Sequence, residues 1–488
     1  MRFRLEQWQN ESETIVLILH SLPMGAFKKG EFKMGKRFFL LLVWSFSMQV
    51  NASIQVKEPN PVPAATLERP PQFVLISFDG SYSDQFWKES FNLADKANAK
   101  FSYFVSGVYF IEHNDNKLYQ GPDHSLGVSD IGFGDNSLAD LSTRTENVWQ
   151  ALQKNFDIGS HVNGHFDGTK WSEAQWTSEF TQFHKFVERV FSIYPGIKEN
   201  FSSQWEQKMK SEIKGFRAPL LAESPGVAAT LEKFNYLYDS SKVLNSQWPY
   251  QMNDGIWNVG LSEVELAGSG RRTIAMDYNL LYGQCDGKFN PKNGGECANL
   301  TDAVLAHDQD QTYRTYIQAF LKSYYGNRSP ISIGHHFSLF NRGIYWMALQ
   351  KFTYAVCNQP EVKCVTHSEM IKWLEAQKQA RGANYLTALN KGQFDQRTTL
   401  SSVRQALALP LAVAPVQVAA KDLQTNLSLT SDTEMASDDI LNAVSARPID
   451  EVQAQMLKGD LPGAHMFDHE VMDLESARYE PSNERANR

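Results

Sequence analysis

Short apolar runs alternate with longer amphipathic segments from Gln72 onward. The runs have the length of buried strands, and the longer segments space their apolar residues as helices do. The expected strands are Phe73–Phe78, Phe101–Val105, Phe156–Gly159, Ile213–Phe216, Tyr236–Tyr238, Thr273–Met276, Ile331–Gly334 and Val362–Thr366. The expected helices are Thr145–Lys154, Ser172–Ser192, Thr312–Tyr325 and Ser368–Lys378. Strands that alternate with helices predict parallel βαβ units, and about eight of them predict an α/β fold of the (β/α) barrel type.

The composition of the chain changes after Lys378. Residues 401–488 hold 14 Asp and Glu against 7 Lys and Arg, and only two of the 59 aromatic residues lie there. A segment with excess charge and few large apolar side chains cannot bury enough surface to fold. We therefore expect 71–378 to form one folded domain and 379–488 to be a low-complexity, mostly disordered acidic tail. No long basic stripe is present, so a nucleic-acid partner is not expected.

The segment 34–52 is typical of a secretory signal peptide. Lys36 and Arg37 precede an apolar run that ends at Phe46, and the expected cleavage follows Ala52. The run is too short to span a bilayer comfortably, so no stable membrane insertion is expected after cleavage. A short buried strand or helix is the alternative.

A signal peptide belongs at the start of a chain, so we interpret residues 1–33 as a gene-model extension. Residues 53–70 contain several prolines and are expected to be a linker. The mature protein is then expected to be secreted or periplasmic.

The chain contains four cysteines: Cys285, Cys297, Cys357 and Cys364. An even number of cysteines in an exported chain predicts disulfides. Three pairings are possible, and the two local ones close the shortest loops. Zinc binding by these cysteines is not favoured, because neither local pair has C-x-x-C spacing.

Residues of chemically reactive types directly follow several apolar runs. They are Asp79, His161, Arg217, Asp239 and His335. The carboxyl ends of the strands in a parallel barrel meet at one mouth, so we expect these side chains to face one pocket.

His161 and His165 lie four residues apart in the segment HVNGH. On a helical turn, residues i and i+4 share a face, so both imidazoles can bind one metal ion. A structural role for each histidine is the alternative. The position at a strand end, beside an acidic loop, favours a metal site.

The other candidates have roles in acid and base chemistry. Asp79 lies in a small-residue turn, where it can bind metal, act as general base or only cap the loop. Arg217 can orient that carboxylate or form an ordinary ion pair at the barrel rim. His335 can protonate a leaving group, whereas strand alternation sends His336 to the opposite face, where a core role fits better. A metal, a base and an acid together predict a hydrolase for an amide or ester.

These segments resemble, in their order, the motifs of the polysaccharide deacetylases of the NodB-homology type, the fourth carbohydrate esterase family. The family motifs T-F-D-D-G, H-[ST]-x-x-H and R-x-P correspond to SFDGS at 77–81, HVNGH at 161–165 and RAP at 217–219. SIGH at 332–335 corresponds to a late strand that ends in histidine. The resemblance spans roughly residues 70–378. It implies a distorted (β/α) barrel that removes acetyl groups from chitin-like polysaccharides or peptidoglycan with a divalent metal, for which zinc is expected.

The resemblance also implies roles for single residues. Asp79 would be the general base, Arg217 the residue that tunes it, and His335 the general acid. The metal ligands would be His161 and His165. Segments around Asp239 and Trp248 are similar to arthropod-type chitin deacetylases, and the expected substrate-binding residues are Pro219, Asp239 and Trp248.

One position departs from the family pattern. Gly80 stands where the family has its second aspartate, which supplies the third protein ligand of the metal. Asp84 is a substitute ligand if it turns toward the ion. Without a third ligand, the alternative is a catalytically impaired protein that binds glycans.

Two alternatives therefore remain beside the deacetylase. A glycan-binding barrel would stack sugar rings on aromatic side chains, for which the candidates are Trp171, Trp248, Trp257 and Trp346. A hydrolase of non-sugar amides would keep the metal, because substrate choice lies in loops such as Gly107–Asp140 and Tyr282–Asp302.

Overall fold

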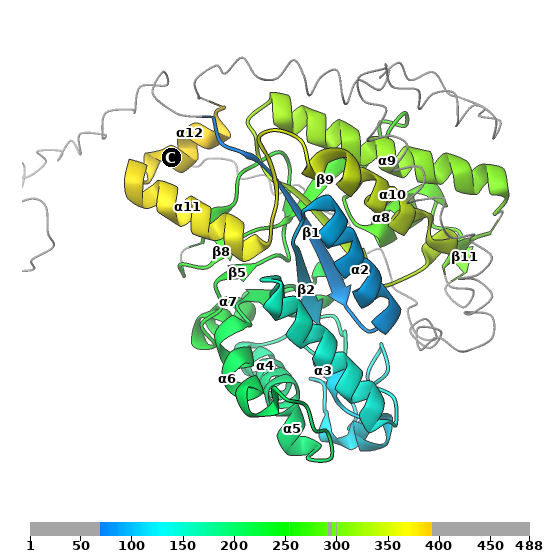
Figure 1. Ribbon diagram of the computed structural model, residues 1–488, viewed down its shortest axis with the longest axis vertical. Helices are drawn as coiled ribbons and strands as arrows, with labels where there is room; N and C mark the ends of the chain where they lie inside the picture. The colour runs from blue at the N-terminus through cyan, green and yellow to red at the C-terminus, as the bar shows by residue number, and fades with distance from the viewer. Residues whose placement is uncertain (1–68, 253, 291–294, 299, 393–488) are drawn as a thin grey trace, which may run out of the picture. The chain divides into compact units, whose positions relative to one another are not determined.

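The computed structural model describes residues 69–392 except 253, 291–294 and 299. The predictions for 1–33, for 34–52 and for nearly all of the linker and the acidic tail fall outside these residues. A largely parallel sheet forms the centre of the described part (Figure 1), with the strand order β13-β1-β2-β3-β4-β5-β8-β7 and β14 paired with β1. Its strands are β1 (Gln72–Gly80), β2 (Phe101–Val105), β3 (Asp157–Ser160), β4 (Gly215–Phe216), β5 (Tyr238–Asp239), β7 (Tyr250–Gln251), β8 (Trp257–Asn258), β13 (Ile331–His336) and β14 (Val362–Cys364).

The sheet curls into a barrel that closes without a regular strand ladder. Strand β9 (Leu261–Glu265) pairs with β6 (Val243–Leu244) and β10 (Arg272–Ile274) in a separate three-stranded sheet. Between β9 and β13, the Ala275 N–H donates to Ser262 O at 2.9 Å, and Ala275 O accepts from Gly334 N at 2.9 Å. The Ser332 N–H also donates to Ser262 Oγ at 2.9 Å, so three hydrogen bonds and not a regular ladder complete the ring, which confirms the expected distorted α/β barrel.

Alternate residues of β1 face two different cores. Val74, Ile76 and Phe78 belong to the larger core, between the sheet and the surrounding helices. Phe73 and Leu75 belong to a smaller core inside the barrel. Because side chains alternate along a strand, Ser77 and Asp79 continue this inward row. The barrel interior is therefore apolar at the amino ends of the strands and polar at their carboxyl ends.

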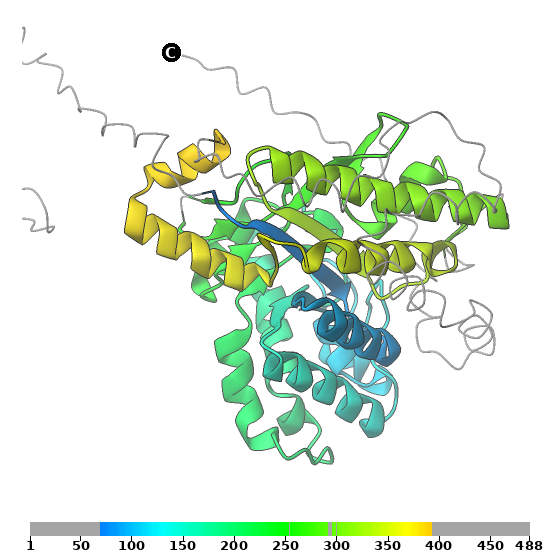
Figure 2. The same ribbon diagram turned by 45° about the horizontal axis from the view of Figure 1, so that its top comes forward.

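Helices pack around the strands of the sheet. The longer ones are α2 (Asp84–Ala97), α3 (Leu138–Gln153), α4 (Glu173–Glu188), α6 (Ser202–Glu212), α9 (Asp302–Tyr325), α10 (Phe340–Cys357) and α11 (His367–Arg381). The shorter ones are α5 (Val190–Ile193), α7 (Gly226–Lys233), α8 (Asp277–Gln284) and α12 (Asn384–Asn390), with the 3-10 turns η2 (Gly107–Phe110), η3 (His113–Leu118) and η4 (Pro219–Leu221). Helices α9 and α10 lie side by side in both views (Figure 1, Figure 2).

Polar side chains cap the starts of several helices. Ser83, Ser137, Thr301 and Thr366 each accept a backbone N–H at the start of α2, α3, α9 and α11. Ser172 and Gln175 form a reciprocal capping box at the start of α4. Each cap satisfies a donor that the helix itself leaves unpaired, so the helix starts are encoded locally.

Several elements differ from the sequence-based expectation. The run Thr273–Met276 was expected to be a barrel strand, but β10 pairs antiparallel with β9, outside the main sheet. The folded part continues past 378, because α12 buries Tyr385 and Leu389 in the smaller core. The cysteines form the two local disulfides, Cys285–Cys297 and Cys357–Cys364.

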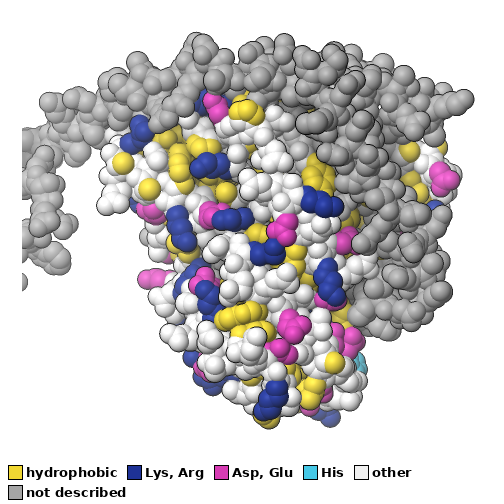
Figure 3. Space-filling view, in the orientation of Figure 1, with side chains coloured by type: hydrophobic (Ala, Val, Ile, Leu, Met, Phe, Trp, Pro, Cys, Tyr) yellow, Lys and Arg dark blue, Asp and Glu magenta, His cyan; other side chains and the backbone are white. Residues whose placement is uncertain are grey.

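One face of the described residues carries mixed charge. On the face shown in Figure 3, Lys and Arg side chains are interspersed with Asp and Glu. Among the described residues, none of the helices is both long and apolar enough to cross a membrane.

Candidate active site

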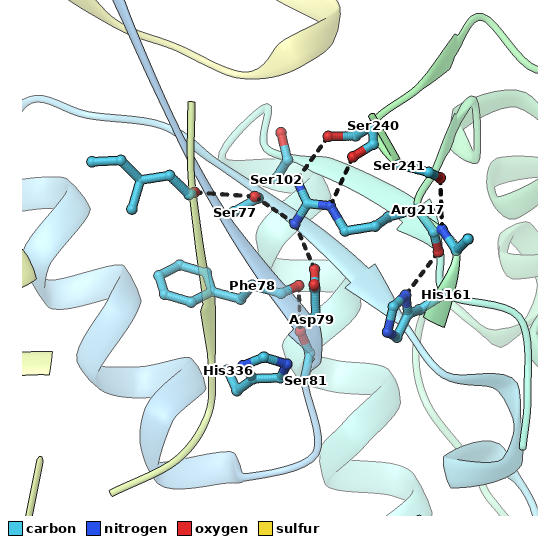
Figure 4. A network of polar contacts seen from close by, with 12 residues as sticks. Ser77, Phe78, Asp79, Ser81, Ser102, His161, Arg217, Ser240, Ser241 and His336 are labelled. Atoms are coloured by element: carbon cyan, nitrogen blue, oxygen red, sulfur yellow. Dashed lines mark hydrogen bonds and ion pairs between the residues drawn. The ribbon is translucent and has the colours of Figure 1, made fainter. Parts of the chain in front are cut away.

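A buried ion pair lies at the carboxyl end of β1. The Arg217 Nη1 donates to Asp79 Oδ1 at 2.7 Å, and both side chains are almost fully buried. Arg217 also donates to Ser77 Oγ at 2.9 Å and to Ser240 Oγ at 2.7 Å (Figure 4). Its guanidinium lies over the Phe104 ring, 4.4 Å from the centroid. Arg217 therefore fixes the orientation of the Asp79 carboxylate and supplies the positive charge that offsets its burial.

Asp239 supports the segment that carries Arg217. Its carboxylate accepts the Ser241 N–H at 2.8 Å and the Ser241 hydroxyl at 2.5 Å, and Ser241 Oγ in turn accepts from Ala218 N at 2.9 Å. Burial raises the pKa of Asp239 to about 6. Asp239 is therefore placed near the site as expected, but as a buried support of the Arg217 loop.

His161 and His165 bring their rings together, with centroids 5.2 Å apart. The turn is not helical as expected, because Val162 and His165 have left-handed φ angles of 43° and 62°. The His161 Nδ1–H donates to Arg217 O at 2.8 Å, which leaves Nε2 as the nitrogen that can ligate (Figure 4). Burial lowers the pKa of His161, although the Asp79 carboxylate opposes this, and burial lowers the pKa of His165 further. Both imidazoles are therefore neutral at pH 7, the form that binds metal.

The side chains of the two adjacent histidines of β13 each point to the face of the sheet that was expected for the other. In the parallel register, Asp79 pairs with His336 and Phe78 pairs with His335. His336 therefore shares the inward face of Asp79, and its Nδ1–H donates to Asp277 Oδ1 at 2.7 Å. His335 is buried against α9, with its Nε2 2.9 Å from the Tyr316 hydroxyl. Burial lowers the pKa of His335 to about 4. The expectation that His335 faces the pocket and His336 the core was wrong.

Asp277 was missed by sequence reasoning. It lies at the start of α8, fully buried, and its Oδ2 accepts the backbone N–H of His336 at 2.8 Å. Burial acts to raise the pKa of Asp277, but His336 and His335 together outweigh it, so the net pKa is lowered. Asp277 directly follows the run Thr273–Met276. The search for reactive residues directly after apolar runs, which identified Asp79, would therefore also have identified Asp277.

The residues present fit a divalent metal through two ligands. His161 and His165 offer neutral imidazoles, and a backbone carbonyl fixes the tautomer of His161, as is usual for metal-binding histidines. Among the described residues of 69–392, no group of three His, Cys, Asp or Glu side chains is placed to hold a metal ion. Water would have to complete the coordination.

Neither Gly80 nor Asp84 supplies the third ligand. Gly80 has a left-handed φ of 71°, a conformation that glycine adopts without strain. The Asp84 carboxylate instead accepts from Asn147 Nδ2 of α3 at 2.9 Å and from Lys88 Nζ at 2.7 Å. The expectation that Asp84 substitutes as ligand is therefore not met.

Pro219 and Trp248 were also expected to bind substrate. Pro219 begins η4 next to Arg217 and is buried. Trp248 is fully buried in the smaller core, where its Nε1–H donates to Asn327 O at 2.8 Å, so it cannot contact a substrate. The other tryptophans considered for sugar stacking are also buried: Trp171, Trp257 and Trp346.

Comparisons with known proteins add a likeness of fold. No protein-family model matches the sequence, and no curated protein matches it either. A candidate polysaccharide deacetylase from Mycobacterium smegmatis is similar at 16% identity, over 65% of this chain and 96% of that chain, with a TM-score of 0.41. A mutant of a Bacillus subtilis peptidoglycan deacetylase is similar at 9% identity, over 64% and 96%, with a TM-score of 0.32.

A mutant of a pseudoenzyme of carbohydrate esterase family 4 is similar as well. It has 10% identity over 64% of this chain and 72% of that chain, with a TM-score of 0.31. The chain is thus similar in structure, at low identity, both to deacetylases of this family and to one of its pseudoenzymes. This likeness concerns the fold alone and decides nothing about activity.

Proposed function

We propose that this protein is a metal-dependent hydrolase that removes acetyl groups from an N-acetylated polysaccharide. One observation carries the proposal. Three pairs of chemically matched side chains lie at the carboxyl end of the barrel: Asp79 with Arg217, His161 with His165, and His336 with Asp277. Catalytic residues of parallel barrels are found at this end.

Each pair has a separate task in the proposed reaction. Asp79, held by Arg217, takes a proton from the attacking water. His336 gives a proton from Nε2 to the leaving nitrogen, because Asp277 holds Nδ1 and supports the positive charge that develops on the ring. A divalent metal held by His161 and His165, for which we propose zinc, would polarise the acetyl carbonyl and lower the pKa of water. This assignment replaces His335 by His336 as the proposed acid.

The motif order favours a chitin-like polysaccharide or peptidoglycan as substrate. The similarity of the segments around Asp239 and Trp248 to arthropod-type chitin deacetylases is part of this proposal. Export is part of the proposal, because two disulfides are usual for chains that fold in an oxidising compartment.

Acetate release tests the proposal. The full chain, supplied with zinc or cobalt, is incubated with chitin oligomers and, separately, with peptidoglycan. We expect acetate from at least one of them, and Asp79→Asn is expected to lower the rate by about 10²- to 10⁴-fold, the usual contribution of a general base. Asp84→Asn is the matched control, because the Asp84 carboxylate bonds Asn147 and Lys88 and neither belongs to the proposed site, so this variant should retain the rate. An Asp79→Asn variant as active as the wild type would reject the assignment.

The second candidate is a glycan-binding protein without activity. Gly80 and the absence of a three-residue metal cluster among the described residues favour it. Zinc content of the purified protein separates the two candidates. About one equivalent that is lost in His165→Ala supports the hydrolase, whereas binding of chitin oligomers without zinc and without acetate release supports the second candidate.

A further inference from the structure

Glu179 is a fully buried carboxylate that grips the loop between the two proposed metal ligands. It lies in the middle of α4, and its Oε1 accepts the Asn163 N–H at 3.2 Å and the Tyr119 hydroxyl at 2.9 Å. Its backbone carbonyl accepts Asn163 Nδ2 at 2.8 Å. The Tyr119 oxygen accepts in turn from Gly164 N at 3.1 Å. Both inner N–H groups of the segment Asn163–Gly164 are therefore held, one directly and one through Tyr119.

The loop that Glu179 holds is strained. Val162 is β-branched and has a φ of 43°, and His165 has a φ of 62°. Side chains with a Cβ avoid this region, so such angles persist only where the surroundings impose them. Two further backbone hydrogen bonds fix this loop. Gly107 N donates to Val162 O at 2.7 Å, and Asp130 N donates to Gly164 O at 2.9 Å.

Glu179 would destabilise the folded protein if its only role were to fill the core. Within the described part of the chain, its Oε2 is buried and makes no hydrogen bond. Burial raises the pKa of Glu179 to about 7. An unsatisfied buried carboxylate is unfavourable, and an apolar side chain of similar size would avoid that cost. The acceptor at Oε1 is what an apolar residue could not provide.

We propose that Glu179 is a positioning residue that holds Asn163 and Gly164, so that the imidazoles of His161 and His165 stay close enough to bind one divalent ion. The inference rests on the proposed function for its metal, but the geometry of the loop is a property of the metal-free chain. Glu179 acts through the backbone of the turn, where it bonds Asn163 directly and Gly164 through Tyr119.

Three variants of the full chain test this role. Glu179→Gln keeps an acceptor oxygen for Asn163 and Tyr119, whereas Glu179→Leu removes it. Glu188→Leu is the matched control, because Glu188 is a buried carboxylate of the same helix that bonds His184. The readouts are the dissociation constant for Co²⁺, the visible spectrum of bound Co²⁺, and hydrogen exchange of residues 161–165 in metal-free protein.

Glu179→Leu is expected to weaken Co²⁺ binding by about 10- to 100-fold, the usual effect of losing a supporting contact. It should also change the visible spectrum and speed exchange at 161–165. Glu179→Gln should bind Co²⁺ like the wild type, and Glu188→Leu should change none of the three readouts. This pattern separates positioning from general destabilisation, which would affect both leucine variants.

Two results would overturn the inference: wild-type exchange at 161–165 in Glu179→Leu, or equal losses in Glu188→Leu. A wild type that binds no Co²⁺ would reject the proposed metal, and the exchange measurement would still decide the role of Glu179. If Glu179→Leu does not fold, Tyr119→Phe decides instead, because it removes only the hydroxyl between Gly164 and Glu179. Faster exchange at 161–165 in that variant supports positioning, and unchanged exchange rejects it.

Discussion

His335 and His336 are neighbours in the chain but have different chemical environments. His335 is enclosed between β13 and α9, where burial lowers its pKa to about 4 and its nearest polar partner is the Tyr316 hydroxyl. His336 is partly exposed and paired with a buried carboxylate, Asp277. An imidazole that must exchange protons with a substrate needs access and a partner for its charged form. Only His336 has both.

This difference predicts opposite outcomes for two single substitutions. His336→Gln is expected to lower acetate release by about 10²- to 10⁴-fold with little change in the melting temperature, because a proposed proton donor is lost from a partly exposed position. His335→Gln is expected to lower the melting temperature and to leave most of the activity in the folded fraction. The reverse pattern in paired activity and melting measurements would return the acid role to His335.

At the residue scale, the sequence predicted which strand ends carry the reactive residues. It did not predict which histidine of β13 faces the barrel interior. Asp79, His161 and Arg217 could be predicted because each directly follows an apolar run. The choice between His335 and His336 depends on which of them pairs with Asp79 across the sheet. That register is set by contacts between segments about 250 residues apart, and alternation within one strand does not reveal it.

At the element scale, α4 links the stability of the protein to pH. Glu179, near the middle of α4, has its pKa raised from 4.5 to about 7 by burial. In the unfolded chain the carboxyl would lose its proton near pH 4.5, whereas the folded chain keeps it up to about pH 7. The folded state thus binds the extra proton between these values, so stability falls as the pH rises through this window.

The expected size of this effect can be measured by urea unfolding at pH 5, 6, 7 and 8. A raised pKa of this size corresponds to a loss of about 3 kcal/mol across the window. Glu179→Gln has no such proton to lose, so its free energy of unfolding should fall less between pH 5 and pH 8 than that of the wild type. Equal slopes for the two proteins would show that Glu179 does not titrate in this range.

Elements were predicted best where their pattern is local. The run Phe101–Val105 matches β2, and the start of α4 is signalled by its capping box at Ser172 and Gln175. The HVNGH turn was expected to be helical from its spacing alone. It is left-handed because contacts from α4 and from Tyr119, far away in the sequence, impose its angles.

At the scale of the whole described unit, the polarity of the barrel interior places the site. Helices α11 and α12 contribute Leu374 and Leu389 to the apolar inner core. The carboxyl ends carry the buried charge pair and the histidines. The βαβ pattern could predict this division. The closure between β9 and β13 could not be predicted, because it depends on three hydrogen bonds between distant segments. Composition averages over long windows, which is why α12 was assigned to the tail.

The central claim is that a metal held by His161 and His165 serves a hydrolase with only two protein ligands. It is tested most directly by acetate release from chitin oligomers and peptidoglycan as zinc or cobalt is added to chelator-treated full-length protein. We predict no release without metal, saturation near one equivalent, and at least about a 100-fold loss in His161→Ala, since removal of a ligand disrupts the site. Metal-independent release, or unchanged release by His161→Ala, would contradict the account.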